Sequence, residues 1–416
     1  VMVYNAGGKL QRLDTRTTSG GPLTRQVYYA YDTAGRLTSV TTDLTPADNS
    51  IADGQVYTTS YTYDGSSFRI ASISQSDGTS AAYTYQLVAG DYRVATVTDA
   101  SGTTTFSYDT TNRRTDVTNG LGQVWSYHYD AAGQLIQVQT PSVTGSGRLS
   151  THYAYDSQGN VTSITDGLGN TVTYEYDSRG NRTRERDALG NTVRRTYNSN
   201  NQLSNEITYS EPATFNGTSW SNPPNSSDQT TRFIYDNKSN LRYVIDATGA
   251  VTENRYSSSG LRLAQIRYVD ATFSSNGLLA LDIIDEALLV AWLLNRDKTK
   301  QQLTEFAYDY RGNVTKSTTY ATVNSSGAGI LDAQAQVMEY VYSEHGQLLQ
   351  TIAVRGANRT TKTTLSSMVY DGMGRLMSQV DAKGTQTVTY NGSARQMSVT
   401  NSAGLTTTQV FDTQGR

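Results

Sequence analysis

The chain has 416 residues, of which 36% are apolar and 17% are charged, and its formal net charge is −3. This charge argues against a nucleic-acid-binding protein, which normally carries a basic excess, and the 30 tyrosines argue against a disordered chain. The absence of cysteine excludes a disulfide framework, a zinc-thiolate site and thiol catalysis.

A repeat of about 20–21 residues dominates the sequence. The segments Tyr153–Asn160 and Tyr174–Asn181 share the pattern Tyr-x-Tyr-Asp-x-x-Gly-Asn. The second aromatic residue of the pattern recurs at Tyr4, Tyr31, Tyr63, Tyr85, Tyr108, Tyr129, Tyr155, Tyr176, Tyr197, Tyr235, Tyr256, Tyr308, Tyr342, Tyr370, Tyr390 and Phe411. Where two successive positions in this series are much more than 21 residues apart, the excess indicates an insertion between repeats.

Each repeat is predicted to form two strands and two turns. Tyr-x-Tyr places both rings on one face of a strand, Asp opens a turn, and Gly closes it in a left-handed conformation. The repeat residues that we expect to be structural are Tyr31, Asp32, Gly35, Tyr129, Asp130, Gly133, Tyr155, Asp156, Gly159, Tyr176, Asp177, Gly180, Tyr308, Asp309, Gly312, Tyr370, Asp371 and Gly374. A second turn, such as Asp166–Asn170, follows half a repeat later, which is typical of an antiparallel β meander.

Three insertions interrupt the repeats. Residues 210–228 and 325–336 have the composition of loops. Residues 270–300 form a helical insertion, in which we expect one helix over roughly 277–296 with Asn276 as its N-cap. The apolar face of this helix would comprise Leu281, Ile284, Leu288 and Trp292. We expect that face to be buried against the tyrosine-bearing, concave face of the sheet, because exposed Leu and Ile side chains are costly in water.

The Tyr-x-Tyr-Asp-x-x-Gly-[Asn/Arg]-[Leu/Val] pattern resembles the RHS or YD-repeat family over nearly the whole chain. This family includes bacterial Rhs polymorphic toxins, Tc toxin C components, wall-associated YD-repeat proteins and teneurins. The resemblance implies an all-β fold, in which tandem β-hairpins form a long antiparallel sheet that spirals into a hollow shell. In the toxins the shell holds a C-terminal toxic domain. The family's Asp-Pro motif, which is linked to self-cleavage, has no counterpart here, so that activity is not expected.

Residues 1–416 are expected to be one β-spiral segment, truncated at both ends and belonging to a longer exported or cell-surface bacterial protein. The chain begins inside a repeat at Tyr4 and stops inside a turn at Arg416. The N-terminal residues lack the basic and apolar regions of a signal peptide. No uncharged apolar stretch reaches the roughly 18 residues that a membrane-spanning helix needs.

No residue stands out as catalytic, cofactor-binding or metal-binding. His128, His152 and His345 occupy ordinary repeat positions, and the aspartates are explained by turn chemistry. Calcium at the Asp-Gly turns remains open, although neither an EF-hand nor a Gly-Gly-x-Gly-x-Asp repeat occurs. The cluster Arg182, Arg184, Arg186, Arg194 and Arg195 could bind anions, but we favour a solvated face paired with Glu175, Glu185 and Asp187.

Three functions remain for the chain. The first is a structural shell that encloses or displays a C-terminal, toxin-like domain of the same polypeptide. The alternative is an adhesion module, in which exposed tyrosines bind cell-surface carbohydrate or a receptor. An enzyme is the weakest option, because no nucleophile and base stand together. We favour the shell, since regularly spaced tyrosines on one face are more typical of a structural ladder.

Overall fold

The computed structural model describes residues 1–16, 20–142, 147–216, 220–223, 225–274, 282–356, 359–391 and 396–411. These residues form two compact units. The first unit comprises Val1–Tyr127, Tyr340–Ile352 and Thr364–Arg416, and the second comprises His128–Glu339 and Ala353–Thr363.

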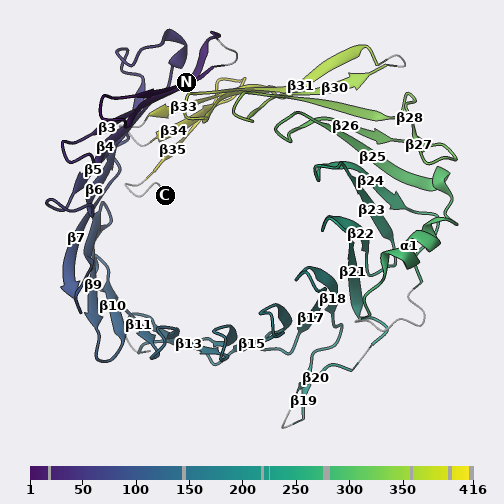
Figure 1. Ribbon diagram of the computed structural model, residues 1–416, viewed down its shortest axis with the longest axis horizontal. Coiled ribbons are helices and arrows are strands. Elements are labelled where there is room, and N and C mark those ends of the chain that lie inside the picture. The colour runs from purple at the N-terminus through teal and green to yellow at the C-terminus, as the bar shows by residue number, and fades with distance from the viewer. Residues whose placement is uncertain are drawn as a thin grey trace. The chain divides into compact units, whose positions relative to one another are not determined.

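One antiparallel sheet contains 31 strands of the described chain, which confirms the all-β prediction (Figure 1). In its first half the strands are β1 (Met2–Tyr4), β2 (Leu10–Arg16), β3 (Leu23–Tyr31), β4 (Leu37–Asp43), β5 (Val56–Tyr63), β6 (Ile70–Gln75), β7 (Ser80–Val88), β8 (Asp91–Asp99), β9 (Gly102–Asp109), β10 (Arg114–Thr118), β11 (Val124–Tyr129), β12 (Leu135–Gln139), β13 (Ser150–Tyr155), β14 (Val161–Thr165), β15 (Thr171–Tyr176), β16 (Arg182–Arg186), β17 (Thr192–Tyr197) and β18 (Leu203–Thr208). The remaining strands are β21 (Gln229–Tyr235), β22 (Leu241–Ile245), β23 (Val251–Tyr256), β24 (Arg262–Tyr268), β25 (Gln301–Tyr308), β26 (Val314–Tyr320), β29 (Gln336–Tyr342), β30 (Leu348–Arg355), β31 (Thr361–Tyr370), β32 (Leu376–Asp381), β33 (Gly384–Asn391), β34 (Gln396–Thr400) and β35 (Thr406–Val410).

Short elements lie in the connections between these strands. Two-residue strands pair in two of them: β19 (Thr214–Phe215) with β20 (Trp220–Ser221), inside the predicted loop 210–228, and β27 (Thr322–Val323), just before the predicted loop 325–336, with β28 (Gly329–Ile330) inside it. The helical elements are α1 (Glu286–Leu293) and the single 3₁₀ turns η1 (Pro46–Asp48) and η2 (Lys298–Lys300).

Most hairpins that contain the repeat motif share one register irregularity, which β9–β10 and β33–β34 lack. In β13–β14, Ala154 pairs with Ser163 but Tyr155 pairs with Val161, so that Thr162 has no partner of its own. The same shift occurs at Tyr31, Tyr176, Tyr235, Tyr256, Tyr308 and Tyr370. An extra residue in one strand bends it and increases its twist, so the repeat places a bulge at regular intervals along the sheet.

The connections at the two ends of the strands differ in length. We call the turns that follow Tyr-x-Tyr strands, such as 156–160 and 177–181, the YD turns, and the edge that they form the YD rim. The opposite ends of the strands form the second rim, which carries the tight turns 166–170 and 187–191. The second rim also carries all the long connections: 44–55, 140–149, 209–228, 269–300 and 321–335. The long connections therefore lie at one end of the strands, while the described connections at the other end are short.

Helix α1 covers the largest apolar cluster of the second unit. The buried cluster comprises Ile234, Tyr243, Ile245, Val251, Ala264, Ile266, Tyr268, Phe273, Ile284, Leu289, Leu303 and Val323. Trp292 packs against it, with its ring 6.0 Å from that of Tyr268 and 5.8 Å from that of Phe273. The insertion thus provides the sheet with a core.

The helix lies within the predicted range of roughly 277–296, and Ile284 and Trp292 join the buried cluster as predicted, but the first residue, the N-cap and the exposure of Leu288 differ from the prediction. The helix begins at Glu286, and its N-cap is Asp285, whose carboxylate accepts a hydrogen bond from the Ala287 N–H; Asn276 and Leu281 lie outside the described residues. Leu289 is fully buried, whereas Leu288 is 48% exposed. The segment is apolar on every side, so the spacing of its apolar residues could not indicate which face is buried.

The helix also packs on the opposite face of the sheet from the one we predicted. In β21, Ile234 belongs to the buried cluster and pairs directly with Tyr243, while Phe233 and Tyr235 of the repeat motif alternate to the other face. Helix α1 therefore covers the face of the sheet opposite to the one that carries Phe233 and Tyr235. In the described residues, no helix has the length and apolar character needed to span a bilayer.

Candidate functional site

The YD turns fix their aspartates through internal hydrogen bonds. In the turn 156–160, Oδ1 of Asp156 accepts the backbone N–H groups of Gln158 and Asn160 at 2.9 Å, and Oδ2 accepts the Asn160 side-chain amide at 2.9 Å. Turns at Asp177 and Asp309 repeat this arrangement. These bonds, led by the one from the Asn side chain, lower the pKa of all three carboxyl groups.

Other YD turns replace the asparagine with a different fifth residue. The Arg36 and Arg375 guanidiniums each donate at 2.7 Å to the aspartate of their own turn, Asp32 and Asp371. At Asp130, the carboxylate accepts the backbone N–H groups of Ala132 and Gln134. The turn aspartates thus accept hydrogen bonds from their own turns, as the turn chemistry predicts.

The turn glycines have the left-handed backbone that the motif predicts. Gly159 and Gly180 have φ angles of 88° and 82°. Positive φ also occurs at the other predicted turn glycines, Gly35, Gly133, Gly312 and Gly374. Where the sequence lacks glycine at this position, Asn201 and Ser239 adopt the same conformation at φ of 61° and 70°.

The second tyrosine of the motif reaches back to the preceding repeat. The Tyr155 hydroxyl donates to the Leu135 carbonyl at 2.7 Å, and Tyr31 donates to Leu10 at 3.0 Å. The same bond is made by Tyr63, Tyr85, Tyr197, Tyr256, Tyr308, Tyr370 and Tyr390, each to the first residue of an earlier strand. Tyr108 makes it to Val94, inside β8. We call this bond the tyrosine latch. Burial raises the pKa of Tyr155 and Tyr176, which keeps their hydroxyls protonated.

Arginines cover several of these rings. The Arg36 guanidinium lies 4.6 Å from the Tyr63 ring centre, and Arg375 lies 4.4 Å from that of Tyr390. Cations at such distances are attracted to the ring face. The rings therefore contribute to packing within the sheet rather than forming a bare aromatic row.

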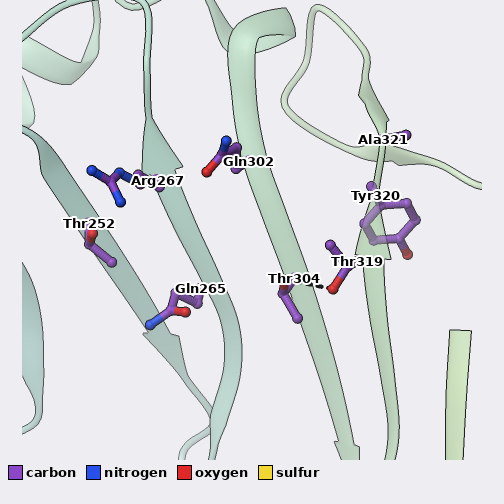
Figure 2. Close-up of a pocket in the computed structure, with 8 residues that line it drawn as sticks. All are labelled: Thr252, Gln265, Arg267, Gln302, Thr304, Thr319, Tyr320 and Ala321. Carbon is purple, nitrogen blue, oxygen red and sulfur yellow. Dashed lines mark hydrogen bonds between the residues drawn. The ribbon is translucent and has the colours of Figure 1, made fainter. Parts of the chain in front are cut away.

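A polar cleft of about 560 Å³ crosses four strands of the second unit, β23 to β26 (Figure 2). Its lining residues are Thr252, Gln265, Arg267, Gln302, Thr304, Thr319, Tyr320 and Ala321. Figure 2 shows Arg267 and Gln302 side by side on adjacent strands. The hydroxyls of Thr304 and Thr319 are joined by a hydrogen bond of 3.0 Å. The nearest carboxylate partner of Arg267 is Asp246 at 3.8 Å. Guanidinium, amide and hydroxyl groups suit a polar ligand with acidic or hydroxyl groups. The sequence analysis missed this cleft, because its residues fill ordinary strand positions.

A buried carboxylate beneath α1 was also missed. The side chain of Glu253 is only 3% exposed, and it accepts hydrogen bonds from Arg242 at 2.9 Å, Arg255 at 2.8 Å and Tyr268 at 2.6 Å. Hydrogen bonding to Glu253 raises the pKa of Arg255, and burial raises that of Tyr268. The alternation of Glu253 and Arg255 on one strand was the only sequence signal for this network.

The predicted arginine cluster is mostly paired. Arg184 contacts Glu175 at 2.9 Å, Arg182 contacts Glu185 at 3.3 Å, and Arg195 contacts Glu185 at 3.5 Å. Arg186 instead stacks over the Trp220 ring at 4.0 Å, and burial lowers its pKa. Arg194 pairs with Arg184 in the register of β16 and β17. Asp187, which we expected to pair with this cluster, accepts hydrogen bonds within its own turn.

The three histidines occupy separate places. His128 and His152 lie in β11 and β13, and His345 lies in the YD turn 343–347 of the first unit. Across the described ranges, no group of three or more His, Cys, Asp or Glu side chains could hold a metal ion.

Residues 93–192 match the RHS Repeat family model in four overlapping segments: 93–123, 108–142, 142–171 and 155–192. This part of the chain is similar to RHS repeats. The matched RHS repeats contain the turns at Asp130, Asp156 and Asp177, whose geometry recurs before and after them. No curated protein sequence matches the chain.

Solved structures share the fold of this chain at low identity. A crystal structure of TcdB2-TccC3 without its hypervariable C-terminal region aligns with a TM-score of 0.57 and 13% identity, over 94% of this chain and 21% of that one. A Photorhabdus luminescens Tc holotoxin pore gives 0.57 and 12% over the same shares. The chain thus spans about a fifth of the length of these structures, and the likeness shows a shared fold.

Proposed function

We propose that this chain is a structural segment of an RHS shell that encloses or displays a C-terminal domain of the same, longer polypeptide. The observation that carries the proposal is the fold likeness to the TcdB2-TccC3 structure over 94% of the chain. The hydrogen bonds within the YD turns and the tyrosine latches support it, because these residues hold the sheet together. On this proposal the protein is exported or lies at a bacterial cell surface, and it needs no cofactor.

The enclosing role is testable by limited proteolysis of the full polypeptide that contains this chain. We expect its C-terminal domain to resist protease in the native protein and to become sensitive when the shell is opened by mild denaturant. The isolated C-terminal domain is the control. Equal cleavage rates for the isolated and the attached domain would contradict enclosure.

The proposal includes the absence of catalysis. The candidate acids and histidines either accept hydrogen bonds within turns or lie apart from one another. Assays for hydrolase, nuclease and protease turnover should give no activity that depends on His128, His152, His345 or a turn aspartate. Activity abolished by one such substitution would refute this part of the proposal.

The polar cleft favours a second function, adhesion to carbohydrate. Its arginine, amides and hydroxyls offer donors to sugar hydroxyls and carboxylates. The chain would then bind acidic glycans on an array, and Arg267→Gln would remove the binding, while Arg179→Gln, which changes an exposed turn arginine, would not. Absence of binding, or equal binding by both variants, would eliminate this function and leave the shell proposal untouched.

A further inference from the structure

One arginine of the cluster on β16 has no anionic partner. Arg186 is only 7% exposed, yet in the described part of the chain its guanidinium forms no ion pair and donates no hydrogen bond. Arg184, two residues earlier, pairs with Glu175 at 2.9 Å. The nitrogens of Arg186 are not sealed from solvent, whereas the Nε of Arg184 is. A buried charge without a counter-ion is costly, so this guanidinium is available to bind an anion.

Two exposed aromatic rings lie next to this guanidinium. The Trp220 ring centre is 4.0 Å from the guanidinium of Arg186, and the Phe215 ring centre is 5.1 Å from that of Trp220. The two aromatic residues pair directly between β19 and β20, which helps to explain how so short a ribbon forms. Their pairing does not account for their exposure, because Trp220 remains 40% exposed and Phe215 remains 54% exposed. A buried cation is thus combined with apolar surface that faces water.

The insertion that carries the rings is fixed to the sheet. Arg186 is the last residue of β16 and directly precedes the turn 187–191. The Ala213 N–H donates to the Gly190 carbonyl at 2.7 Å, and a Cβ on Gly190 would lie 2.9 Å from the Ala213 carbonyl oxygen. Phe215 follows two residues later, where the ribbon β19–β20 projects from the sheet (Figure 1). The backbone contact therefore holds the ribbon beside the end of β16.

The face of the sheet around Arg186 has an excess of positive charge. Arg184 pairs with Arg194 in the register of β16 and β17, and Arg186 shares their face because side chains alternate along a strand. Among the described residues, Glu175 is the one carboxylate that forms an ion pair with any of these three arginines. Burial, together with the nearby Arg184, lowers the pKa of Arg186. An anion bound at Arg186 would offset this unbalanced charge.

These groups suit a ligand in which a carboxylate is attached to an apolar ring. A guanidinium can bind a carboxylate through two parallel hydrogen bonds, and aromatic rings pack favourably against another ring. The polar cleft of β23 to β26 offers amides and hydroxyls instead. The two surfaces therefore differ in the ligands that they fit.

We propose that Arg186, Trp220 and Phe215 form a binding site for an aromatic carboxylate. The carboxylate pairs with the Arg186 guanidinium, and the ring of the ligand packs against Trp220 and Phe215. A free aromatic acid and the C-terminal aromatic residue of a partner peptide both carry this chemistry. The site is independent of the shell role and of the polar cleft.

Calorimetric titration of the whole chain with N-acetylphenylalanine tests this site. For a ligand of this size we expect a dissociation constant of about 1 mM. The neutral N-acetylphenylalanine amide lacks the charge and acetate lacks the ring, so each should bind at least about tenfold more weakly. A short peptide that ends in phenylalanine identifies the source of the ligand. Tighter binding of the peptide than of the free acid assigns the site to a chain terminus, and weaker binding assigns it to a small aromatic acid.

Substitutions separate binding from packing. Arg186→Met should weaken binding of N-acetylphenylalanine about tenfold or more. It should not lower the melting temperature, because it removes a buried charge that has no partner. Arg267→Met in the polar cleft and Arg179→Met in an exposed turn carry the same substitution, and both should bind like the wild type.

Trp220 also reports where the ligand binds. Titration should change the tryptophan fluorescence of the wild type, whereas Trp220→Phe should keep calorimetric binding and lose that change, although Trp125 and Trp292 remain. Absence of saturable binding up to about 10 mM would overturn the proposal. So would binding of the amide or of acetate as tight as that of the acid, binding that Arg186→Met leaves intact, or binding that Arg267→Met removes.

Discussion

Two regions of the second unit are stabilised in different ways. Between residues 150 and 203, all of which the structure describes, no apolar side chain is fully buried. Between residues 229 and 323, the same repeat lies under α1 and contributes to a large buried cluster. The first region relies on strand pairing, saturated turns and tyrosine latches, and the second adds a hydrophobic core. The comparison teaches that the repeat forms its sheet without a buried apolar core. Where a core exists, the helical insertion supplies it.

The largest effect that this comparison predicts is at the helix. Leu289→Asp places a charge at a fully buried position, and we expect the free energy of unfolding of the helix-covered region to fall by about 4 kcal/mol or more. Leu288→Asp, at its half-exposed neighbour, should change it by less than about 0.5 kcal/mol. Thermal unfolding measures both. Equal destabilisation by the two variants would mean that the buried face of α1 is wrongly assigned.

The next largest effect is the difference between removing a buried carboxylate and removing an exposed one. Glu253→Ala removes the buried carboxylate that Arg242 and the half-exposed Arg255 share and leaves the Tyr268 hydroxyl without its acceptor, which should cost about 2–3 kcal/mol. Glu175→Ala removes a 56%-exposed partner of Arg184 and should cost at most about 1 kcal/mol. Chemical denaturation of the two variants gives both values. A comparable loss of stability in both variants would contradict the difference between the buried and the exposed charge network.

A smaller effect is expected in the coreless region. Gly180 has φ of 82°, and a Cβ there would meet only the Asn160 side chain at 3.7 Å, so Gly180→Val is strained by its backbone rather than by a clash. We expect a loss of about 1–3 kcal/mol, seen as faster amide exchange in the hairpin β15–β16. The adjacent exposed Arg179→Val is the control. Because repeats couple only to their neighbours, the backbone amides of the helix-covered region should stay protected from exchange. Faster exchange there would show long-range coupling.

The smallest effect is the acid response of the YD turns. Hydrogen bonds, chiefly from the asparagine side chain, lower the folded-state pKa of Asp156, Asp177 and Asp309 below the ordinary value of 3.8. Their stabilisation is therefore complete above that value and is lost as the pH falls through the lowered pKa. Asn181→Ala removes the main cause at Asp177 and should shift the acid loss of amide protection in β15–β16 to higher pH. An unchanged acid profile would contradict the role of this hydrogen bond.

The repeat was predictable because its chemistry is local. Asp156 and Gly159 define a turn within five residues, and alternation along a strand assigns the tyrosine face, so sequence was sufficient for the sheet and its turns. The helix was predicted only approximately, since the segment around Leu288 and Leu289 is apolar on all sides and the choice of face depends on distant residues such as Tyr243. The acceptor of each latch, the polar cleft and the Glu253 network arise from strands packed side by side, where no single motif marks them.

The separation of the two rims has an evolutionary consequence. The second rim already carries a helix, short hairpins and extended loops, while the YD rim keeps its turns short and cross-linked, for example by Gln202 to the Ser239 carbonyl and Gln347 to the Gly374 carbonyl. New sequence can therefore enter at one edge without altering the bulge, the latch or the turn that define the next repeat. Long connections and the recurring YD turn are divided between opposite ends of the same strands, so an insertion adds surface at one edge without interrupting the scaffold at the other.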